Sequence, residues 1–377
     1  MNILPILNYL NHYELTELTA YSGVKVKDYG DFVVLNYDQI ETKKTDIRWH
    51  DARGLIVRKQ AKGQYSNADI LCRPFTRFFN FGETFDSNEF PFERAIAYDK
   101  IDGSLMSAWF NPFAKRWEVA TRQMAFGEGT TSFGNSYRQL FLDGGFDGEE
   151  DFFQHTMFML DQAMPGYTWI FEMTSPETRV VTPHAEKNIW FLAARNNLSG
   201  QYMMASAIRE LLEDLIPNMK FPKEYHFNSA KDCELAAKDL PAMEEGYVVY
   251  DPITQNRVKL KNPAYVAIHH LRDNGALNPK RILTLVMENE HEEYLAYFPE
   301  DRQFFEPYIR KFGELKTWIE NTYEDIKDIP SQKNFALEAC KTPFSGILFE
   351  MRKGTSLDAS LEKIQLDRVL DILNQFK

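Results

Sequence analysis

The alternation of apolar and polar residues along the first two thirds of the chain predicts many short strands. Residues 24–27 and 32–37 predict a hairpin across Tyr29-Gly30-Asp31, and residues 244–250 with 257–261 predict a second hairpin. Short apolar runs bounded by turn residues predict further strands at 53–57, 70–73, 95–98, 105–110, 117–122, 168–173 and 189–195. The run at 189–195 is almost continuously apolar, which is typical of a strand buried on both faces.

Helical spacing of apolar residues predicts helices at 1–20, 203–215 and 230–239, and a polar segment followed by a helix over 131–164. From Pro263 onward this helical pattern replaces the alternation. One amphipathic face is formed by Tyr308, Phe312, Leu315, Ile319 and Tyr323. A last helix is predicted after Gly354-Thr355. We therefore predict an α+β fold of antiparallel sheets with flanking helices over residues 1–262, followed by an all-α domain over 263–377.

Composition narrows the class of protein. With 377 residues, two domains are expected, and a hydrophobic content of 44% provides enough material for two cores. The net charge of −12 argues against a general nucleic-acid coat protein or a binder of anionic membranes. Three widely spaced cysteines make a disulfide framework and a zinc cluster improbable and fit a reducing compartment. Residues 1–20 do not resemble a signal peptide and no run of eighteen apolar residues exists, so we expect no membrane span and no membrane partner.

The candidate chemistry begins at Lys100-Ile101-Asp102-Gly103, a Lys-x-Asp-Gly segment between two predicted strands. Gly103 permits a tight turn or a close approach to a ligand, and Lys100 at such a corner could act as a nucleophile. An amine attacks only when it is deprotonated, so burial or nearby cations should lower the pKa of Lys100. Such a tetrapeptide is expected by chance in roughly one chain in ten of this length, and alone it is more often a hairpin turn.

Other charged residues lie within predicted strands. Lys259 and Lys261 are two residues apart and therefore share one face, although any half-exposed strand shows the same alternation. Glu172 lies within Trp-Ile-Phe-Glu-Met, where an unpaired carboxylate would be costly. We therefore expect Glu172 to have a partner. Strand ends also carry Arg53, Arg77, Lys100, Asp102, Arg122 and Glu245.

These segments together resemble the covalent nucleotidyltransferases, which include polynucleotide ligases and RNA capping enzymes. The similarity rests on motifs I, III, IIIa, IV and V, at Lys100-Ile101-Asp102-Gly103, Phe171-Glu172, Trp190-Phe191, Glu245-Gly246-Tyr247-Val248 and Val258-Lys259-Leu260-Lys261. Residues 51–56 and 73–80 further resemble the bacteriophage RNA ligase 1 family, which repairs tRNA. The resemblance covers residues 30–262 by motif and the remainder only by length and helical character.

The resemblance implies an adenylyltransferase domain that uses ATP and Mg²⁺, for which Mn²⁺ could substitute. Lys100 would be adenylylated, with Asp102, Lys259 and Lys261 as further catalytic residues. Glu245 would interact with the metal ion. The implied nucleotide-binding residues are Arg53, Arg77, Phe79, Lys100, Gly103, Arg122, Glu172, Phe191, Glu245, Lys259 and Lys261.

Individual roles follow from the same resemblance. Glu172 would bond the adenosine ribose, Phe191 would pack on the adenine, and Lys259 and Lys261 would hold the α-phosphate. Arg77 and Arg122 stand where the family pattern has lysines. Both replacements keep the positive charge, and an arginine can bind phosphate with two prongs.

The implied function is ATP-dependent joining of RNA 5′-phosphate and 3′-hydroxyl ends, in repair of tRNA broken in the anticodon loop. The helical domain would supply RNA specificity, although it carries more acidic than basic residues. We expect a monomer, located in the host cytoplasm if a phage encodes it. The alternatives are a nick-sealing ligase, an mRNA capping guanylyltransferase, an inactive ligase fold that binds nucleic-acid ends, and a structural protein with chance motif matches. The helical pattern after Pro263 argues against the β-barrel that follows motif V in DNA ligases and capping enzymes.

Overall fold

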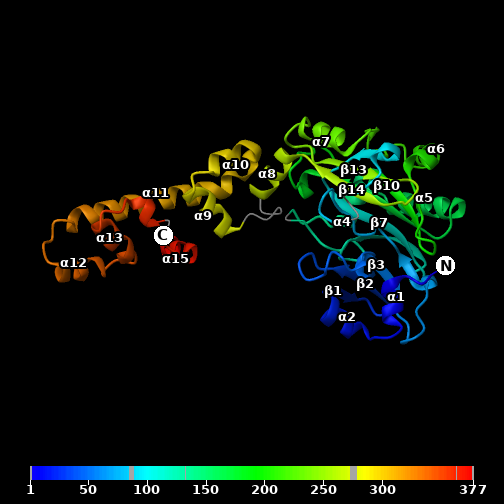
Figure 1. The fold of residues 1–377 in the computed structure, drawn as a ribbon, viewed down its shortest axis with the longest axis horizontal. Coiled ribbons are helices and arrows are strands. Elements are labelled where there is room, and N and C mark those ends of the chain that lie inside the picture. Colours follow the sequence, from blue (N-terminus) through cyan, green and yellow to red (C-terminus); the bar gives the residue numbers. More distant parts are fainter. Residues whose placement is uncertain (1, 85–88, 132, 272–277, 362, 376–377) are drawn as a thin grey trace. The chain divides into compact units, whose positions relative to one another are not determined.

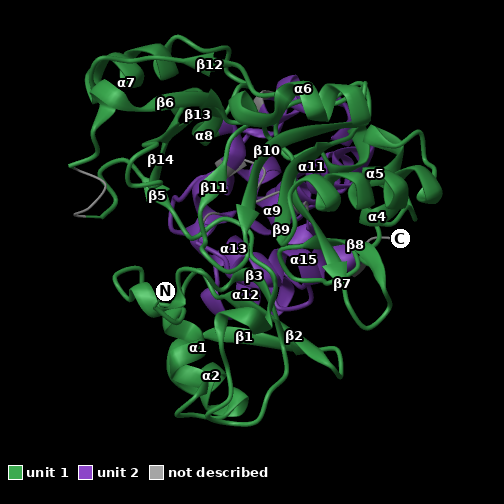
Figure 2. Cartoon of the chain, turned by 90° about the vertical axis from the view of Figure 1, so that its right-hand side faces the viewer, with its two compact units in different colours: residues 1–267 green, residues 268–377 purple. Residues whose placement is uncertain are grey.

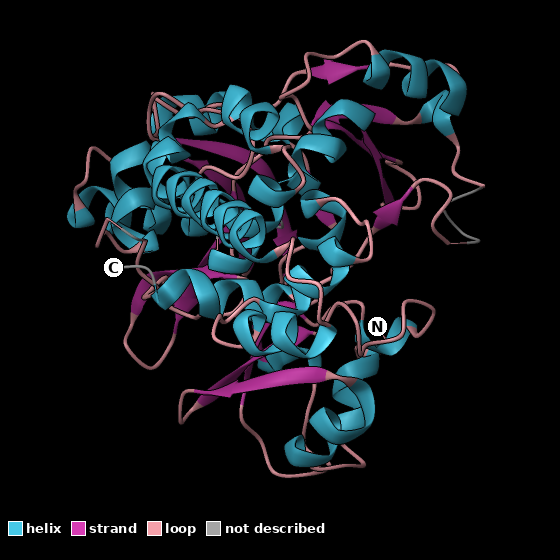
Figure 3. Ribbon diagram, turned by 90° about the vertical axis from the view of Figure 1, so that its left-hand side faces the viewer, coloured by secondary structure: helices cyan, strands magenta, loops and turns pink. Residues whose placement is uncertain are grey.

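The computed structural model describes residues 2–84, 89–131, 133–271, 278–361 and 363–375. The chain divides into two compact units, residues 1–267 and 268–377, which Figure 2 shows in two colours. Unit 1 contains all the described strands and several helices, whereas the described part of unit 2 is helical. Figure 3 shows the helices and strands in different colours. Helix α8 (Pro263–Leu271) begins in unit 1 and contains the boundary between the units.

The first sheet of unit 1 is built from the N-terminal hairpin. Its order is β1 (Val24–Asp28), β2 (Phe32–Tyr37), β3 (Arg53–Arg58) and β4 (Ile70–Cys72), and all neighbours are antiparallel (Figure 1). Every residue of β2 is buried because both faces of the sheet are covered. Val33 and Leu35 pack with the N-terminal helices, and Phe32 and Val34 pack with Trp109 of the second sheet.

The N-terminal segment forms two helices, α1 (Pro5–Leu10) and α2 (Leu15–Ser22), and the prediction of one helix over residues 1–20 is wrong. Helix α1 ends at Asn11, whose side-chain amide donates to the carbonyl of Tyr65 and whose side-chain oxygen accepts from the Tyr65 amide. A capping box of Glu14 and Glu17 then begins α2. The break lets both helices bury their apolar residues on the same sheet.

The second sheet carries a large hydrophobic core. Its order is β11 (Tyr202–Met203), β10 (Asn188–Asn196), β9 (Tyr167–Thr174), β7 (Ser104–Asn111) and β8 (Arg116–Thr121). Three helices cover one face of it, namely α4 (Tyr137–Gly145), α5 (Glu150–Ala163) and α6 (Ala205–Leu215). The opposite face carries a smaller apolar cluster that includes Leu105 and Leu192. This second face is the one that lines the cavity described below.

The third sheet has the order β12 (Glu224–Tyr225), β6 (Ile96–Asp99), β13 (Gly246–Tyr250), β14 (Arg257–Lys261) and β5 (Phe79–Asn80). The hairpin predicted from residues 244–250 and 257–261 is confirmed as β13 and β14. Its residues Tyr247, Val249, Val258 and Leu260 pack against α7 (Ala230–Lys238). The alternate residues of these strands, which include Lys259 and Lys261, therefore face the other way.

The segment around Lys100 connects two sheets. Strand β6 lies in the third sheet, and β7, which follows it, lies in the second. Lys100-Ile101-Asp102-Gly103 is therefore a crossover and not a hairpin turn, the alternative that its sequence alone left open. This crossover places Lys100 where the two sheets meet.

Unit 2 consists of α9 (Pro279–Met287), α10 (His291–Tyr297), α11 (Arg302–Ile326), α12 (Gln332–Ala339), α13 (Ser345–Arg352), α14 (Leu357–Leu361) and α15 (Leu366–Gln375). The predicted amphipathic face lies on α11, where Phe312, Leu315 and Ile319 are buried. The predicted last helix is in fact two helices, α14 and α15. None of the described helices combines the length and the apolar character that crossing a bilayer requires.

Candidate active site

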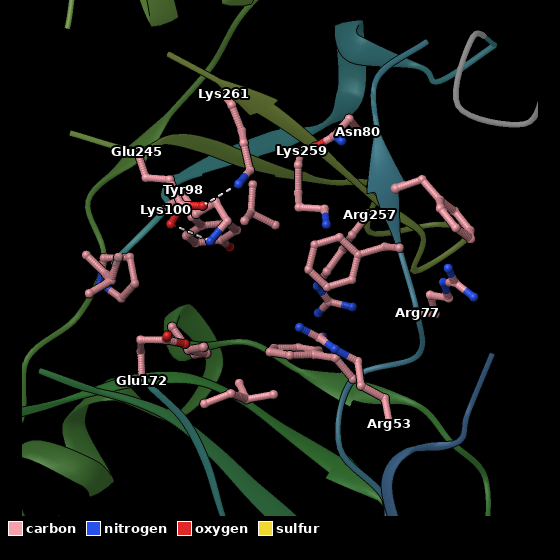
Figure 4. Close-up of a pocket in the computed structure, with 18 of the residues that line it drawn as sticks. Arg53, Arg77, Asn80, Tyr98, Lys100, Glu172, Glu245, Arg257, Lys259 and Lys261 are labelled. Atoms are coloured by element: carbon pink, nitrogen blue, oxygen red, sulfur yellow. Dashed lines mark hydrogen bonds and ion pairs between the residues drawn. The ribbon is translucent and has the colours of Figure 1, made fainter. Parts of the chain in front are cut away.

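A cavity of about 460 Å³ lies within unit 1. Its walls are the exposed face of the third sheet, the face of the second sheet that carries Leu105 and Leu192, and the segment around Arg77. Most of the residues predicted as site residues line it: Arg53, Arg77, Phe79, Lys100, Arg122, Glu172, Phe191, Glu245, Lys259 and Lys261. Figure 4 shows ten of its lining residues with labels, and the charged side chains converge on one space.

Lys100 and Lys261 share one carboxylate at this cavity. Lys100 Nζ donates to Glu245 Oε2 at 2.6 Å, and Lys261 Nζ lies 2.9 Å from Glu245 Oε1 (Figure 4). Glu245 is 6% exposed, and the two lysines hold the pKa of its carboxyl below the usual range even though burial opposes this. Both carboxylate oxygens are therefore engaged in the ligand-free protein.

The pKa of Lys100 moves opposite to our expectation from the sequence. Burial acts to lower the pKa, but Glu245 and Glu172 outweigh burial and raise it above the usual lysine value. The cations expected to lower it are outweighed because the nearest charged group is a carboxylate in direct hydrogen-bond contact. In the ligand-free protein Lys100 is therefore protonated at neutral pH and has to lose a proton before it can act as a nucleophile.

Lys259 lies two residues from Lys261 on β14, but no described carboxylate forms an ion pair with it. Burial, followed by the charges of Arg53 and Lys100, lowers the pKa of Lys259 to about 7. Glu172 shows the complementary effect, because burial raises its pKa to about 8 against the attraction of Lys100. The cavity thus holds a lysine and a glutamate that each change protonation state between about pH 7 and pH 8.

Three arginines line the cavity, and two of them lie over the ring of Tyr37. The guanidinium carbon of Arg77 lies 4.2 Å from the centre of the Tyr37 ring, and that of Arg122 lies 4.7 Å from it. Arg53 stacks over Phe78 at 5.2 Å, and its Nη1 atom is buried without a hydrogen-bond partner among the described residues. No described carboxylate forms an ion pair with any of the three. Such a cluster of cations is complementary to a polyanion.

Two glycines allow the chain segments of the site to approach each other. A Cβ atom on Gly103 would lie 2.4 Å from the carbonyl oxygen of Met173 on β9. Gly246 has a φ of +128°, and a Cβ atom there would lie 2.2 Å from the carbonyl oxygen of Leu260. Any side chain at either position would push the backbone around Lys100 or Glu245 out of place. Gly103 therefore has a packing role that the sequence had suggested only in general terms.

Asp102 is bound by backbone groups. Its carboxylate accepts hydrogen bonds from the amides of Val181 and Thr182 at 2.8 and 2.7 Å, and it is 6% exposed. Asp102 is not among the residues that line the cavity. The structure therefore supports a positioning role, in which Asp102 fixes the crossover against the segment at 181–182, and it gives no support to the predicted catalytic role.

Phe191, which was predicted to pack on the adenine, borders the cavity and has a buried side chain. The Phe191 ring is fully buried in the core beneath the helices, where it contacts Trp169, Phe171 and Phe221. A register shift in β10 at Phe191/Ala193 turns the chain here, and Leu192 belongs to the apolar cluster on the cavity side. Phe191 and Leu192 both line the cavity, and Leu192 is the more exposed of the two.

Several further lining residues were not predicted, among them Tyr37, Tyr98 and Arg257. A signal existed for two of them, because Tyr98 precedes Lys100 by two residues and Arg257 precedes Lys259 by two. Residues spaced by two on a strand share a face. Tyr37 ends a strand of a different sheet, and nothing in the local sequence links it to the site.

The residues present are compatible with a divalent cation only in part. Among the described residues, no group of three histidines, cysteines or acids is close enough to form a metal site alone. Glu245 and Glu172 offer carboxylate oxygens, the ligands that Mg²⁺ prefers, and Mg²⁺ commonly completes its shell with substrate phosphates and water. A magnesium ion that enters together with a nucleotide fits this donor set.

Comparison with known proteins gives one family. The sequence profile described as RNA ligase matches residues 51–265. The chain is 29% identical over 363 residues to a protein of Autographa californica nuclear polyhedrosis virus that is named as a bifunctional polynucleotide kinase/RNA ligase. This match covers 91% of the chain and 49% of the viral protein, so the chain spans about half the length of that relative.

Further similarities are weaker. An RNA ligase of Rhodothermus phage RM378 is 22% identical, over 87% of this chain and 84% of the phage protein. Among solved structures, an archaeal ATP-dependent RNA ligase overlaps 72% of this chain and 64% of its own at 12% identity, with a TM-score of 0.43. An RNA ligase of Naegleria gruberi with AMP and Mn overlaps 52% of this chain and 58% of its own at 13% identity, with a TM-score of 0.40.

Proposed function

The chain belongs to the RNA ligase family, and from this premise we propose that it joins RNA ends in an ATP-dependent reaction, through an adenylate formed on Lys100. The observation that carries the proposal is the charge arrangement of the cavity. A candidate nucleophile lies beside Lys259 and Lys261 and shares the cavity with Arg53, Arg77 and Arg122. The arginines have no described carboxylate partner, so the cavity has surplus positive charge that a triphosphate would neutralise.

The first step requires a deprotonated Lys100. Its Nζ atom attacks the α-phosphorus of ATP, a nitrogen–phosphorus bond forms, and the bond from phosphorus to the pyrophosphate oxygen breaks. Glu245, in direct contact with Nζ, is positioned to take the lysine proton before it passes to solvent. The cations of the cavity would stabilise the charge that develops on the phosphoryl oxygens and on the departing pyrophosphate.

Magnesium would be held by a carboxylate oxygen of Glu245 together with phosphate oxygens. When bound, such an ion supplies charge neutralisation at the phosphates. Because both Glu245 oxygens already contact lysines, the chain has to release Lys100 or Lys261 from Glu245 for the ion to bind there. Release of Lys100 would also remove the main interaction that raises its pKa.

Two further steps complete the joining of RNA. AMP passes from Lys100 to the 5′-phosphate of one RNA end, where a new phosphoanhydride bond replaces the nitrogen–phosphorus bond. The 3′-hydroxyl of the second end then attacks that 5′-phosphate, forms the phosphodiester bond and releases AMP. Glu172, with a pKa raised to about 8, can bond the ribose hydroxyls in either protonation state.

We propose nicked tRNA as the RNA substrate and unit 2 as the part that recognises it. Support for a repair role comes from the viral relative, whose name joins a polynucleotide kinase to an RNA ligase. A chain that ends after α8 should keep self-adenylylation and lose sealing of nicked tRNA. If this shortened chain seals nicked tRNA as well as the full chain does, unit 2 has no part in recognition.

The experiment that tests the proposed function is self-labelling. The protein is mixed with α-labelled ATP and Mg²⁺ and denatured, and label on the protein is measured. Wild type and a Lys59→Ala control, which alters a surface ion pair with Asp28, should be labelled, and Lys100→Ala should not. Labelling by GTP in place of ATP would indicate a capping enzyme. A folded wild-type protein that takes no label, and carries no AMP by mass, would contradict the proposal.

A further inference from the structure

Tyr98 carries a polar group that the protein itself leaves unsatisfied. Its side chain lines the cavity and is 7% exposed, and its hydroxyl is buried without a hydrogen-bond partner among the described residues (Figure 4). Most buried polar groups in folded proteins have a partner, and leaving one unpaired costs stability. The Tyr98 hydroxyl therefore has an unfilled hydrogen-bonding position inside a cavity that can hold a ligand.

Arg257 is a buried cation in the same wall that has no described carboxylate partner. It is 8% exposed, and its guanidinium carbon lies 4.0 Å from the ring centre of Tyr202, 4.4 Å from Tyr250 and 4.6 Å from Phe75. Its described polar contacts are a long one of 3.4 Å to the Gln255 carbonyl and one to the Met204 sulfur, which is a weak acceptor. A buried charge held in this way calls for acceptors from a ligand.

The register of the third sheet places both groups beside the phosphate-binding lysines. Tyr98 is level with Val248, and Val248 is level with Lys259. The next row along the sheet contains Tyr250 and Arg257. Arg257 lies four residues from Lys261, which is about 13 Å along a strand. Tyr98 therefore shares the row of Lys259, and Arg257 lies one row beyond it, so a nucleotide whose phosphates contact Lys259 and Lys261 has both groups within its length.

The surroundings of Arg257 separate it from the phosphate subsite. Burial lowers the pKa of Arg257, and the titratable groups that act on it are Tyr202, Tyr250, Arg195 and Tyr98, rather than the lysines around Glu245. The cavity wall also carries apolar side chains, among them Leu105, Leu192, Met204, Ala205, Pro222 and Val248. Apolar walls with a few polar groups at one end fit a flat heterocycle with a polar edge.

We propose that Tyr98 and Arg257 bind the polar edge of the purine base of ATP and select adenine there. Tyr98 Oη would accept a hydrogen bond from the 6-amino group, and Arg257 would donate to a ring nitrogen. The donor and acceptor inventories agree, because a guanidinium only donates and a phenol hydroxyl can also accept. This inference rests on the proposed function for the identity of the nucleotide and adds the residues that read its base.

The test compares ATP with purine riboside 5′-triphosphate, which lacks only the 6-amino group. Binding of each to the full chain is measured by calorimetry for wild type and Tyr98→Phe. Wild type should bind ATP about five- to tenfold more tightly, the range of one neutral hydrogen bond. Tyr98→Phe should bind both nucleotides equally, at the wild-type level for the analogue. If Tyr98→Phe keeps the wild-type preference for ATP, the proposal is overturned.

Tyr247→Phe is the matched control, because Tyr247 is buried on the opposite face of the same sheet and packs against α7. It should keep the preference for ATP. Without nucleotide, Tyr98→Phe should melt at the wild-type temperature or higher, because it removes a buried hydroxyl that has no described partner. A hydroxyl that served only the fold would give the reverse pattern, a lower melting temperature with an unchanged preference.

Arg257→Met tests the second residue, because it keeps much of the length and removes the charge. It should weaken binding of ATP and of the analogue alike, by about tenfold or more, since a charged donor is lost. Where Arg257→Met does not fold, Arg257→Lys keeps a charge but loses the planar fork. Unchanged binding in the folded variant would remove Arg257 from the proposal.

The binding measurements separate this inference from the proposed function. If wild type binds ATP but takes no label, the proposed ligase chemistry fails, and the ratio of ATP to analogue still decides the role of Tyr98. If wild type binds GTP more tightly than ATP, or binds neither ATP nor the analogue, selection of adenine by Tyr98 and Arg257 is wrong.

Discussion

Unit 1 contains two groups of arginines that differ in their partners. Arg73 and Arg195 share the carboxylate of Asp51, with Arg195 Nη1 at 2.7 Å and Arg73 Nε at 3.3 Å from Asp51 Oδ1. Arg77 and Arg122 stack on Tyr37 and have no described carboxylate partner. A carboxylate that neutralises buried arginines favours a structural role for them. Arginines that line a cavity and have no carboxylate partner are better suited to bind an anion.

Arg73 and Arg195 find hydrogen-bond partners within the protein in addition to Asp51. Arg195 also donates to the carbonyls of Pro74 and Gly200, and Arg73 donates to that of Asn197. These bonds tie the segment after β4 to the end of β10. The pair of arginines thereby positions the chain from which Arg77 projects into the cavity. Structural and anion-binding arginines are thus only a few residues apart in sequence, and their partners distinguish them.

The largest effect in this comparison is expected for Asp51→Ala. It would leave two buried guanidinium groups without their carboxylate, so the free energy of unfolding should fall by about 3–5 kcal/mol. Denaturant unfolding measures this. Arg73 and Arg195 lower the pKa of Asp51 although burial opposes them. The stabilisation is therefore present above the unfolded-state pKa and is lost as the pH falls through the folded-state pKa.

The control for Asp51 is Asp28→Ala, which breaks an exposed ion pair with Lys59. This change should alter the free energy of unfolding by less than about 1 kcal/mol. If Asp51→Ala is no more destabilising than Asp28→Ala, the paired arginines are not a structural element.

Arg77→Met should show the opposite pattern. Loss of charged hydrogen bonds to a triphosphate should weaken ATP binding by about 10- to 100-fold. The unfolding free energy should change much less than in Asp51→Ala, because removing the Arg77 guanidinium leaves no described carboxylate without its partner. The Arg77 guanidinium donates a hydrogen bond to the Thr42 carbonyl at 3.1 Å. Calorimetry with ATP and a denaturant melt separate the two effects, and strong destabilisation with unchanged ATP affinity would reverse the assignment.

Lys259 allows the same comparison by pH. Because its pKa is about 7, Lys259 is mostly neutral at higher pH and has to take up a proton to bind ATP as a cation. Metal-free ATP binding should therefore weaken by up to about tenfold per pH unit above 7. Lys259→Arg, whose guanidinium stays charged, should remove this extra dependence, and the ionisation of ATP itself is common to both proteins. Equal pH profiles for the two proteins would contradict the lowered pKa.

The sign for the ligand-free fold is opposite. A lysine with a lowered pKa binds fewer protons in the folded state than in the unfolded state between pH 7 and its unfolded value of 10.5. The contribution of Lys259 to stability therefore rises with pH across this window and is lost as the pH falls through 7.

The sequence could predict what depends on local spacing. The two hairpins, the strands between them and the shared face of Lys259 and Lys261 all follow from a period of two residues. The gathering of Lys100 with Glu245 depends on how three sheets pack, but a family resemblance could predict it because relatives share that packing. The register shift in β10, which buries Phe191 and leaves Leu192 on the cavity side, depends on a bulge that no local pattern announces.

The wrong prediction for the pKa of Lys100 is explained by the charged group that it contacts. The sequence indicated many cations near Lys100 and so a lowered pKa, but the contact at 2.6 Å between Lys100 and Glu245 decides the direction. Asp102 is similar, because the sequence could not show that two backbone amides occupy its carboxylate. Ion pairing and hydrogen bonding at this scale require the three-dimensional arrangement.

The smallest expected effect concerns the reactivity of the two lysines. Lys100 and Lys259 line the same cavity, but Glu245 raises the pKa of the first, and burial with neighbouring cations lowers the second to about 7. Near neutral pH an amine-selective reagent should therefore modify Lys259 several-fold faster than Lys100, which mass spectrometry of the peptides measures. Glu245→Gln should raise the reactivity of Lys100, because the negative charge that holds its proton is gone. Faster modification of Lys100 than of Lys259 in the wild-type protein would contradict the prediction, because it would show that Lys100 is the more deprotonated of the two.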